Sequence, residues 1–491
     1  MNLSSLREMA EDFLQDVQEE IYQQVAGHKR KLDISAVHAR YPALFSRDSL
    51  TFLLEQRAKA QGEERRRLDY LGRFLADGYL ARGVSQLTDE IASREASAVV
   101  DWQGETVPFR YLAVMLAQES DPARRKALAL LRDKVLSQLN PLRAERFVRR
   151  CALVRELSYD SYPALMEDFG GPHSASLRAL LEDLMAETDV AFTELLEEAL
   201  LDIVGLSLDQ TQTHDIPRLI RALPFDRYFP ADKALNCLHN TLQQMGIHLA
   251  EQSNIILDIA PRDRKKPGAF ALPVHIPDKI YFVVQPIGGQ DDYQALLHEA
   301  GHAEHWAHIS PAQPFEFKRL GDDAVTESFA FLFEHLTTNR QWLRCHLALD
   351  QSDVYLKFAR LVRLYKIRRY AARFFYALEA YALADPTLLA DRYLSLFGKI
   401  LAVQSSPEMY LKDLDDQLYA VCYLRAWMFE PQLKTRLRDQ AGEHWFQARE
   451  GGEILRQLWQ WGQRYGVAEL ARQLGDDGLD SQALRTELLP D

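Results

Sequence analysis

Residues 295–310 read ALLHEAGHAEHWAHIS, an apolar stretch with the period of a helix and the spacing of a metal site. Within it, His298, Glu299 and His302 form an H-E-x-x-H motif. Side chains four residues apart lie on one face of a helix, so both imidazoles can bind one metal ion. Glu299 is rotated by about 100° from His298, which lets its carboxylate reach a water on the metal without binding the metal. The pattern predicts a zinc site with Glu299 as its general base.

Zinc in a catalytic site needs a third protein ligand, with the fourth position left for water. The best candidate is Glu327, which lies 25 residues after His302 in a second predicted helix over 324–336. Prolines between the two helices supply the turn that folds the second helix back against the first. Glu334 lies seven residues after Glu327 on the same helix face, where it can hydrogen-bond to a metal ligand. We expect one zinc ion per chain.

Most of the remaining sequence has helical periodicity with polar caps. Helices are predicted over residues 3–25, 65–82, 123–139, 142–157, 176–204 and 354–384. Short breaks such as Asn140 and Pro141 separate them, which is typical of an antiparallel helical stack. The Gly170–Gly171–Pro172 break predicts a boundary between an N-terminal helical lobe over 1–170 and a catalytic zinc-binding lobe over 171–491.

One region departs from the helical pattern. Three segments are rich in β-branched and aromatic residues and are separated by prolines and glycines: 254–260, 269–274 and 279–285. They predict a small antiparallel sheet over 254–285, beside the zinc helices over 292–340. The strand over 279–284 is expected at the edge, where an extended peptide can add as a further strand. The next helix is predicted to begin at Asp291, with Gln294 completing a capping box.

Composition and charge narrow the class of protein. A chain of 491 residues with 47% hydrophobic content can bury a large core. The net charge of −13 argues against general binding to nucleic acid, which needs a basic surface. No apolar run approaches the roughly 18 residues of a membrane span, and no signal peptide is recognisable. We therefore expect a cytoplasmic protein without a membrane or nucleic-acid partner. Four separated cysteines with no CxxC pair are expected to be reduced, packed thiols: Cys151, Cys237, Cys345 and Cys422.

The motif also supports a family resemblance. Residues 298–305 read HEAGHAEH, which resembles the H-E-x-G-H-A-x-H of the thimet-type oligopeptidases, the M3 metallopeptidases. The glutamates at 327 and 334 and the stretch LDIAPRDRKKPGAF over 257–270 are also similar to that family, so the match covers about 257–336. The resemblance implies a mainly α, two-lobed metallopeptidase with a deep groove and one catalytic zinc ion. It also implies that the substrates are short peptides rather than folded proteins.

The resemblance extends to further site residues. Substrate contacts are expected from Gly268, Ala269, Tyr281 and His305, the last of which can instead support a metal ligand. Members of the family generally carry a histidine before a tyrosine-rich helix, and the segment 413–427 has no histidine. Its Tyr419 or Tyr423 can donate a hydrogen bond to the developing oxyanion, and Arg425 can substitute electrostatically for the histidine.

Two alternatives remain open at this point. The first is a zinc carboxypeptidase, either of the related M32 type or a dipeptidyl carboxypeptidase, in which Arg425 or Arg262 would hold the free carboxylate of the substrate. The second is a helical binding protein with a non-catalytic zinc site. The presence of Glu299 argues against the second alternative, because a structural zinc site needs no general base.

Overall fold

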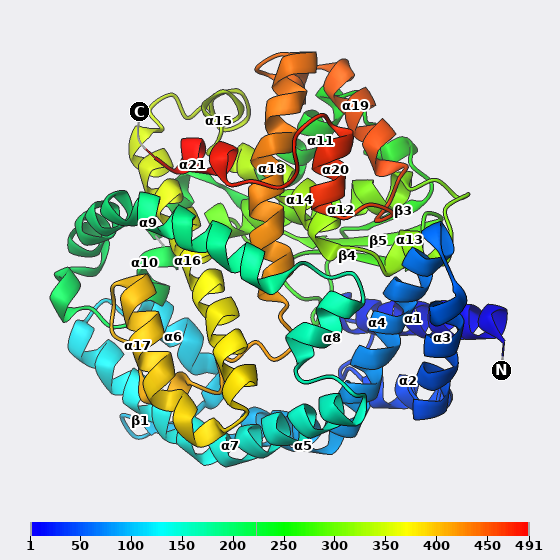
Figure 1. Ribbon diagram of the computed structural model, residues 1–491. Coiled ribbons are helices and arrows are strands. Elements are labelled where there is room, and N and C mark those ends of the chain that lie inside the picture. Colours follow the sequence, from blue (N-terminus) through cyan, green and yellow to red (C-terminus); the bar gives the residue numbers. More distant parts are fainter. Residues whose placement is uncertain (1, 222, 490–491) are drawn as a thin grey trace. The chain divides into compact units, whose positions relative to one another are not determined.

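The computed structural model describes residues 2–221 and 223–489, and these residues form 21 α-helices and five β-strands (Figure 1). The mainly α fold class with small sheets is confirmed. In the described residues, no helix combines the length and apolar character that crossing a membrane requires.

The chain divides into two compact units, each built from separate segments. The first unit comprises Met1–Ala76, Leu223–Asp353 and Arg425–Leu484. The second comprises Asp77–Ala222, Val354–Leu424 and Arg485–Asp491. Residues on both sides of Gly170 therefore belong to the second unit, whereas the sequence predicts a lobe boundary at that glycine.

The first unit contains a three-stranded sheet and the helices around it. Its strands are β3 (Ile255–Asp258), β4 (Gly268–His275) and β5 (Lys279–Gln285). Its helices are α1 (Leu3–Val25), α2 (Ile34–Arg40), α3 (Arg47–Lys59), α4 (Gly62–Gly83, which continues into the second unit), α11 (Ala234–Gln244), α12 (Gln290–His308), α13 (Phe315–Arg319), α14 (Asp323–Glu334), α15 (Arg340–Leu347), α18 (Ala420–Ala441, which begins in the second unit), α19 (Arg449–Trp459) and α20 (Val467–Gln473).

The sheet is mixed, with strand order β3-β5-β4. Strand β5 pairs in parallel with β3 and antiparallel with β4, so the prediction of a purely antiparallel sheet is wrong for β3. The prediction that 279–284 forms an edge is also wrong, because β5 has a strand on both sides. The composition of the three segments cannot reveal the order of the strands, since edge and central strands of a small sheet are both rich in β-branched and aromatic residues. In this order β3 and β4 are the two edge strands of the sheet, and β4 is the longer of the two.

Helix α1 covers one face of the sheet. Val25 and Ala26 at its end pack with Leu272 of β4 and Val283 of β5 in one buried cluster. The predicted limits of this helix are confirmed, because its apolar positions repeat at helical spacing and Asn2 caps its first turn.

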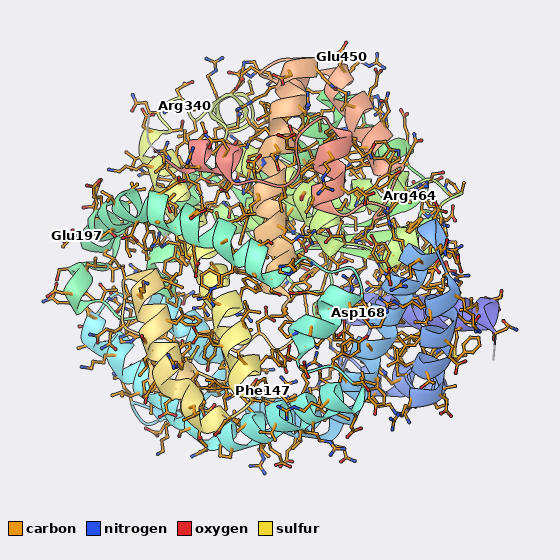
Figure 2. The ribbon with its side chains drawn as sticks, in the orientation of Figure 1. Phe147, Asp168, Glu197, Arg340, Glu450 and Arg464 are labelled. Carbon is orange, nitrogen blue, oxygen red and sulfur yellow. The ribbon has the colours of Figure 1, made fainter. Side chains whose placement is uncertain are left out.

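The second unit consists mainly of helices. These are α5 (Ser85–Ser97), α6 (Leu112–Gln118), α7 (Pro122–Glu156), α8 (Tyr162–Asp168), α9 (Ser174–Ala199), α10 (Ile216–Arg221), α16 (Asp353–Leu383), α17 (Leu389–Leu401) and α21 (Gln482–Leu488, which begins in the first unit). The second unit also contains a hairpin of two strands, β1 (Val99–Trp102) and β2 (Glu105–Pro108). It packs with α6 and α7 around a buried apolar cluster, and it was not among the predicted elements. Figure 2 labels Phe147, a buried residue of α7.

The predicted break at Asn140 and Pro141 is absent, because α7 runs through the proline. A proline in a helix removes one backbone hydrogen bond and costs about 3 kcal/mol in isolation. Buried apolar side chains lie on both sides of Pro141 in the sequence: Leu136, Leu139 and Phe147. Burial of these apolar side chains offsets the local cost, so tertiary packing overrides the sequence signal.

The four cysteines are free thiols. Cys151 and Cys237 are buried, as expected, and burial raises the pKa of each thiol to about 11. Cys422 is half-buried, and the prediction that all four are packed is wrong for Cys345, which is exposed.

Candidate metal centre

The centre is built on two helices that approach each other very closely, α12 and α14. Gly301 of α12 permits this approach, since a Cβ atom there would lie 2.7 Å from the Cα atom of Ala330 and 2.7 Å from the carbonyl oxygen of Phe329. Both of those atoms belong to the backbone of α14, so the clash could not be relieved by the movement of a flexible side chain. A glycine inside a helix is unfavourable by itself, and here it brings the side chains of α14 within reach of those of α12.

His298, His302 and Glu327 converge at this contact. Their ligand atoms all lie within 4.8 Å of one another, which makes them a group able to hold a metal ion. The Oε2 atom of Glu327 is 3.3 Å from Nε2 of His298 and 3.7 Å from Nε2 of His302. Two ligands at zinc bond lengths with tetrahedral geometry are about 3.4 Å apart. The spacing and the two-nitrogen, one-oxygen donor set therefore fit zinc.

The outer side of each imidazole ring is held by α14. Nδ1 of His298 lies 2.9 Å from Oε2 of Glu334, and Nδ1 of His302 lies 2.8 Å from Oγ1 of Thr326. A hydrogen bond from Nδ1 leaves the lone pair on Nε2 available for a metal. Both rings are thus oriented with Nε2 toward Glu327.

The electrostatics of the site favour positive charge. Burial lowers the pKa of His298, but the carboxylates of Glu327 and Glu334 outweigh burial and raise it to about 10. Burial raises the pKa of Glu327, but His302 and His298 outweigh it and lower the pKa to about 2. A buried carboxylate that stays ionised beside two imidazoles is suited to a divalent cation.

Glu299 lies beside the metal ligands and is tied to the sheet. Its Oε2 atom accepts a hydrogen bond of 2.7 Å from the backbone amide of Ala271 in β4. The carboxylate is therefore held at β4, and it is not one of the three side chains that could hold the metal. The Ala271 contact could not be predicted from the sequence, because it joins residues on a strand and a helix through a backbone atom.

Asp322 anchors the start of α14. Its carboxylate accepts hydrogen bonds from the amides of Ala324 and Val467 and forms a two-point ion pair with Arg425, at 2.7 and 2.8 Å. Arg425, expected to act near the substrate, therefore holds the helix that carries Glu327. Asp322 is the N-cap, and the helix begins at Asp323.

The start of α12 also differs from the prediction. Gly289, with φ +94°, is the N-cap and makes no capping bond through a side chain, so the expected capping box with Gln294 is absent. Asp292 instead accepts 2.9 Å hydrogen bonds from the amides of Ile287 and Gly288. This contact fixes the turn between β5 and the metal helix.

The expected substrate residues lie in different environments. His305 is fully buried and its ring lies 4.9 Å from that of Phe329, so its side chain packs in the core. The ring of Tyr281 stacks on Tyr22 of α1 at 3.5 Å. Gly268 and Ala269 begin the edge strand β4, with Gly268 at φ +96°.

The remaining expected residues are placed outside the cluster of ligands. Tyr419 and Tyr423 belong to the second unit, where their rings lie 5.3 Å apart and Tyr419 is half exposed. Arg262 forms an ion pair with Asp258, and its guanidinium also donates to the carbonyl oxygen of Ala26.

Two comparisons with known proteins add no assignment: no protein-family model matches this chain, and no curated protein matches it.

Proposed function

We propose that this chain is a zinc-dependent peptidase that hydrolyses peptide bonds in short peptides. The observation that carries the proposal is the convergence of His298, His302 and Glu327, with Glu299 next to His298 in α12 and its carboxylate held by the Ala271 amide. A structural zinc site has no use for a held, unligated carboxylate, whereas hydrolysis needs a base at that place.

The residues divide the chemistry among them. When bound, zinc would supply Lewis-acid chemistry that polarises the peptide carbonyl and makes a water more acidic. Glu299 takes one proton from the water as the water oxygen adds to the carbonyl carbon. The same carboxylate then gives the proton to the leaving nitrogen as the carbon–nitrogen bond breaks. Glu334 and Thr326 keep the two imidazoles in the orientation that this requires.

The free edge of β4 suits an extended substrate. An edge strand offers unpaired backbone groups, and a peptide can add to them as a further strand. Because these contacts involve the backbone, they select little among side chains. The proposal therefore places the peptide along β4, which corrects the expectation of a peptide on 279–284.

The resemblance to the thimet-type oligopeptidases supports the same activity and one zinc ion per chain. Within this proposal, Tyr419 or Tyr423 supplies the hydrogen bond to the developing oxyanion, and the substrates are short peptides rather than folded proteins. Arg425 is assigned to holding α14 because both of its terminal nitrogens contact Asp322.

The direct test combines metal analysis with peptide cleavage. We expect one zinc per chain and cleavage of members of a quenched fluorescent peptide library, including members with an amidated C-terminus. Cleavage restricted to peptides with a free C-terminal carboxylate would favour the carboxypeptidase alternative. A zinc-loaded chain that cleaves no member would contradict the proposal.

A further inference from the structure

A pocket lies at the end of β4, beyond the residue that holds Glu299. It is bounded by α1, by residues 273–276 and by α13, and it is half open to solvent. All three elements belong to the first unit.

The pocket lies at the edge or the end of the strand. Four consecutive residues line it, from Pro273 to Ile276. Successive side chains of a strand point to opposite faces, so a pocket touched by all four must lie at the edge or end of the strand. The pairing register shifts between Pro273 and His275, and such irregularities redirect side chains.

Two cationic side chains line this pocket, Lys318 and Arg319 of α13. Within the described residues, neither makes a hydrogen bond or an ion pair. Arg319 is only partly exposed, and burial lowers its pKa to about 10, with Asp323 offsetting part of the effect. One acid, Glu11, also lines the pocket, so the charge that remains is positive.

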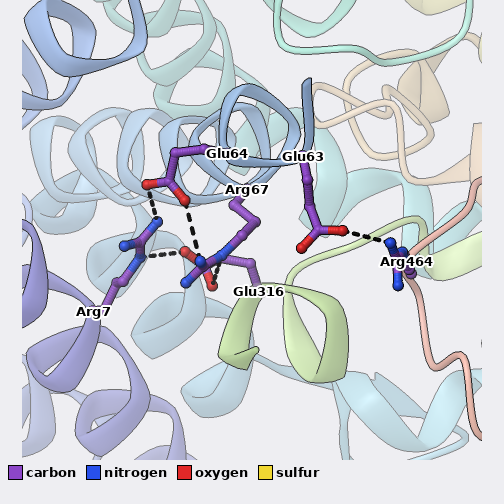
Figure 3. Close-up of polar contacts among 6 residues, drawn as sticks. All are labelled: Arg7, Glu63, Glu64, Arg67, Glu316 and Arg464. Atoms are coloured by element: carbon purple, nitrogen blue, oxygen red, sulfur yellow. Dashed lines mark hydrogen bonds and ion pairs between the residues drawn. The ribbon is translucent and has the colours of Figure 1, made fainter. Parts of the chain in front are cut away.

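The wall that carries these cations is firmly held. Glu316 of α13 is fully buried and accepts hydrogen bonds from Arg7 of α1 and Arg67 of α4, and Glu64 bonds to the same two arginines (Figure 3). Arg319 therefore extends from a helix that is held in place, and Asp323 acts on its guanidinium only electrostatically. A guanidinium fixed in this way is arranged to bind a carboxylate.

We propose that this pocket binds a carboxylate through Arg319, with Lys318 adding charge, and that it takes an acidic side chain of a peptide lying along β4. The substrate part rests on the proposed function. Residues 273–276 lie two to five positions past Ala271, or roughly 7–17 Å along the strand. A peptide antiparallel to β4 would place in the pocket a side chain two to five residues before the cleaved bond.

The binding test does not depend on hydrolysis. The probe is the α-amide of N-acetylglutamate, which carries one side-chain carboxylate, and the matched neutral probe is the α-amide of N-acetylglutamine. Titration of the zinc-loaded full chain, followed by NMR of the probe, should show binding of the first probe only. Arg319→Gln should weaken it at least tenfold, and Arg344→Gln, which removes an exposed positive charge of α15, should leave it unchanged. Equal binding of both probes, or unchanged binding to Arg319→Gln, would overturn the proposal.

Folding of the variant provides a second readout. Since Arg319 has no ion pair, Arg319→Gln should melt at the same temperature as the wild type or higher. A structural arginine would give the opposite shift, and a lower melting temperature together with lost binding would assign Arg319 to the fold. Arg319→Lys should restore part of the binding, because it restores the charge without the planar fork.

The substrate part is tested with pairs of peptides that differ only by Glu or Gln at each of the four positions. The wild type should cleave one Glu member at least tenfold better in kcat/KM, and Arg319→Gln should reduce that ratio to near one. The probe could bind through Arg319 while the enzyme cleaves the Glu and Gln members of every pair equally well. That result would overturn the substrate part and leave a site for a free carboxylic acid. If the probe binds but no peptide is cleaved, the proposed function fails and the carboxylate site stands.

Discussion

The carboxylate of Glu334 lies 2.9 Å from Nδ1 of His298, while Nε2 of the same ring lies 3.3 Å from Glu327. The two glutamates are seven residues apart on α14, which is two helical turns. One helix thus supplies both a candidate metal ligand, Glu327, and the group that orients a second candidate ligand, His298. Because α14 makes both contacts, displacement of that helix would disturb the whole centre.

Glu334→Gln should weaken zinc binding without abolishing it. The amide retains the size of the side chain but loses the charge that favours a cation and the strong hydrogen bond to Nδ1. Loss of such a partner typically lowers metal affinity about 10- to 100-fold. Competition with a chromogenic chelator measures the change. Wild-type affinity in the variant would show that Glu334 has no part in the metal centre.

Gly301→Ala should separate the two metal helices. The new methyl group would meet backbone atoms of α14 at 2.7 Å, and overpacking of this kind costs about 1–3 kcal/mol. We expect lower thermal stability together with lower zinc affinity. Gly398→Ala is the matched control, because a Cβ there meets nothing within 4 Å in helix α17 and should stabilise slightly. A Gly301→Ala variant as stable as the wild type would contradict the close contact.

Glu316→Gln should destabilise the first unit. The variant leaves Arg7 and Arg67 without the buried carboxylate that both contact. Breaking a buried ion pair costs about 3–5 kcal/mol, and we expect the lower end because both arginines are partly exposed. Urea unfolding measures the loss. Glu63→Gln, which breaks the exposed pair with Arg464 in Figure 3, should cost less than about 1 kcal/mol. Equal effects of the two variants would refute the assigned role of Glu316.

Arg425→Gln should lower stability in a pH-dependent way. Burial raises the pKa of Asp322, but Arg425 and the Val467 amide outweigh it and hold the pKa below its ordinary value of 3.8. An acid whose pKa is lower in the folded than in the unfolded protein stabilises the fold at a pH above its unfolded pKa. This contribution is lost as the pH falls below about 4. The gap in unfolding free energy between wild type and variant should therefore be about 3 kcal/mol at pH 7 and shrink toward pH 3.5.

Urea unfolding at several pH values measures that gap, and an unchanged gap at pH 3.5 would contradict the linkage. Peptide cleavage at saturating zinc adds a second readout. A variant with normal zinc content but a kcat lowered 100-fold would return Arg425 to the catalytic role expected from its sequence position.

The sequence was sufficient to predict which three side chains converge at the candidate metal site, because their convergence depends on local spacing. His298 and His302 need only one helix, and Glu327 needs one further helix folded back by prolines. Helix α1 was predicted within its observed limits because its apolar period and cap agree.

Features that depend on long-range packing escaped prediction. Pro141 signals a break, yet the buried side chains around it keep α7 continuous. The order of the sheet strands depends on which strand lies between the others, and nothing in the composition of β5 distinguishes it from β4. The ion pair between Arg425 and Asp322 joins residues 103 apart in the chain, so no local pattern indicates it.

The central claim is that Glu299 is the base of a zinc-dependent hydrolysis, and Glu299→Gln tests it most directly. The variant should keep the fold and one zinc per chain, because the three ligands are untouched, while peptide cleavage should fall about 10²- to 10⁴-fold. Glu327→Gln is the matched comparison, since it should lose zinc and activity together. If zinc-loaded Glu299→Gln cleaves the fluorescent peptides at the wild-type rate, the peptidase assignment of this site is wrong.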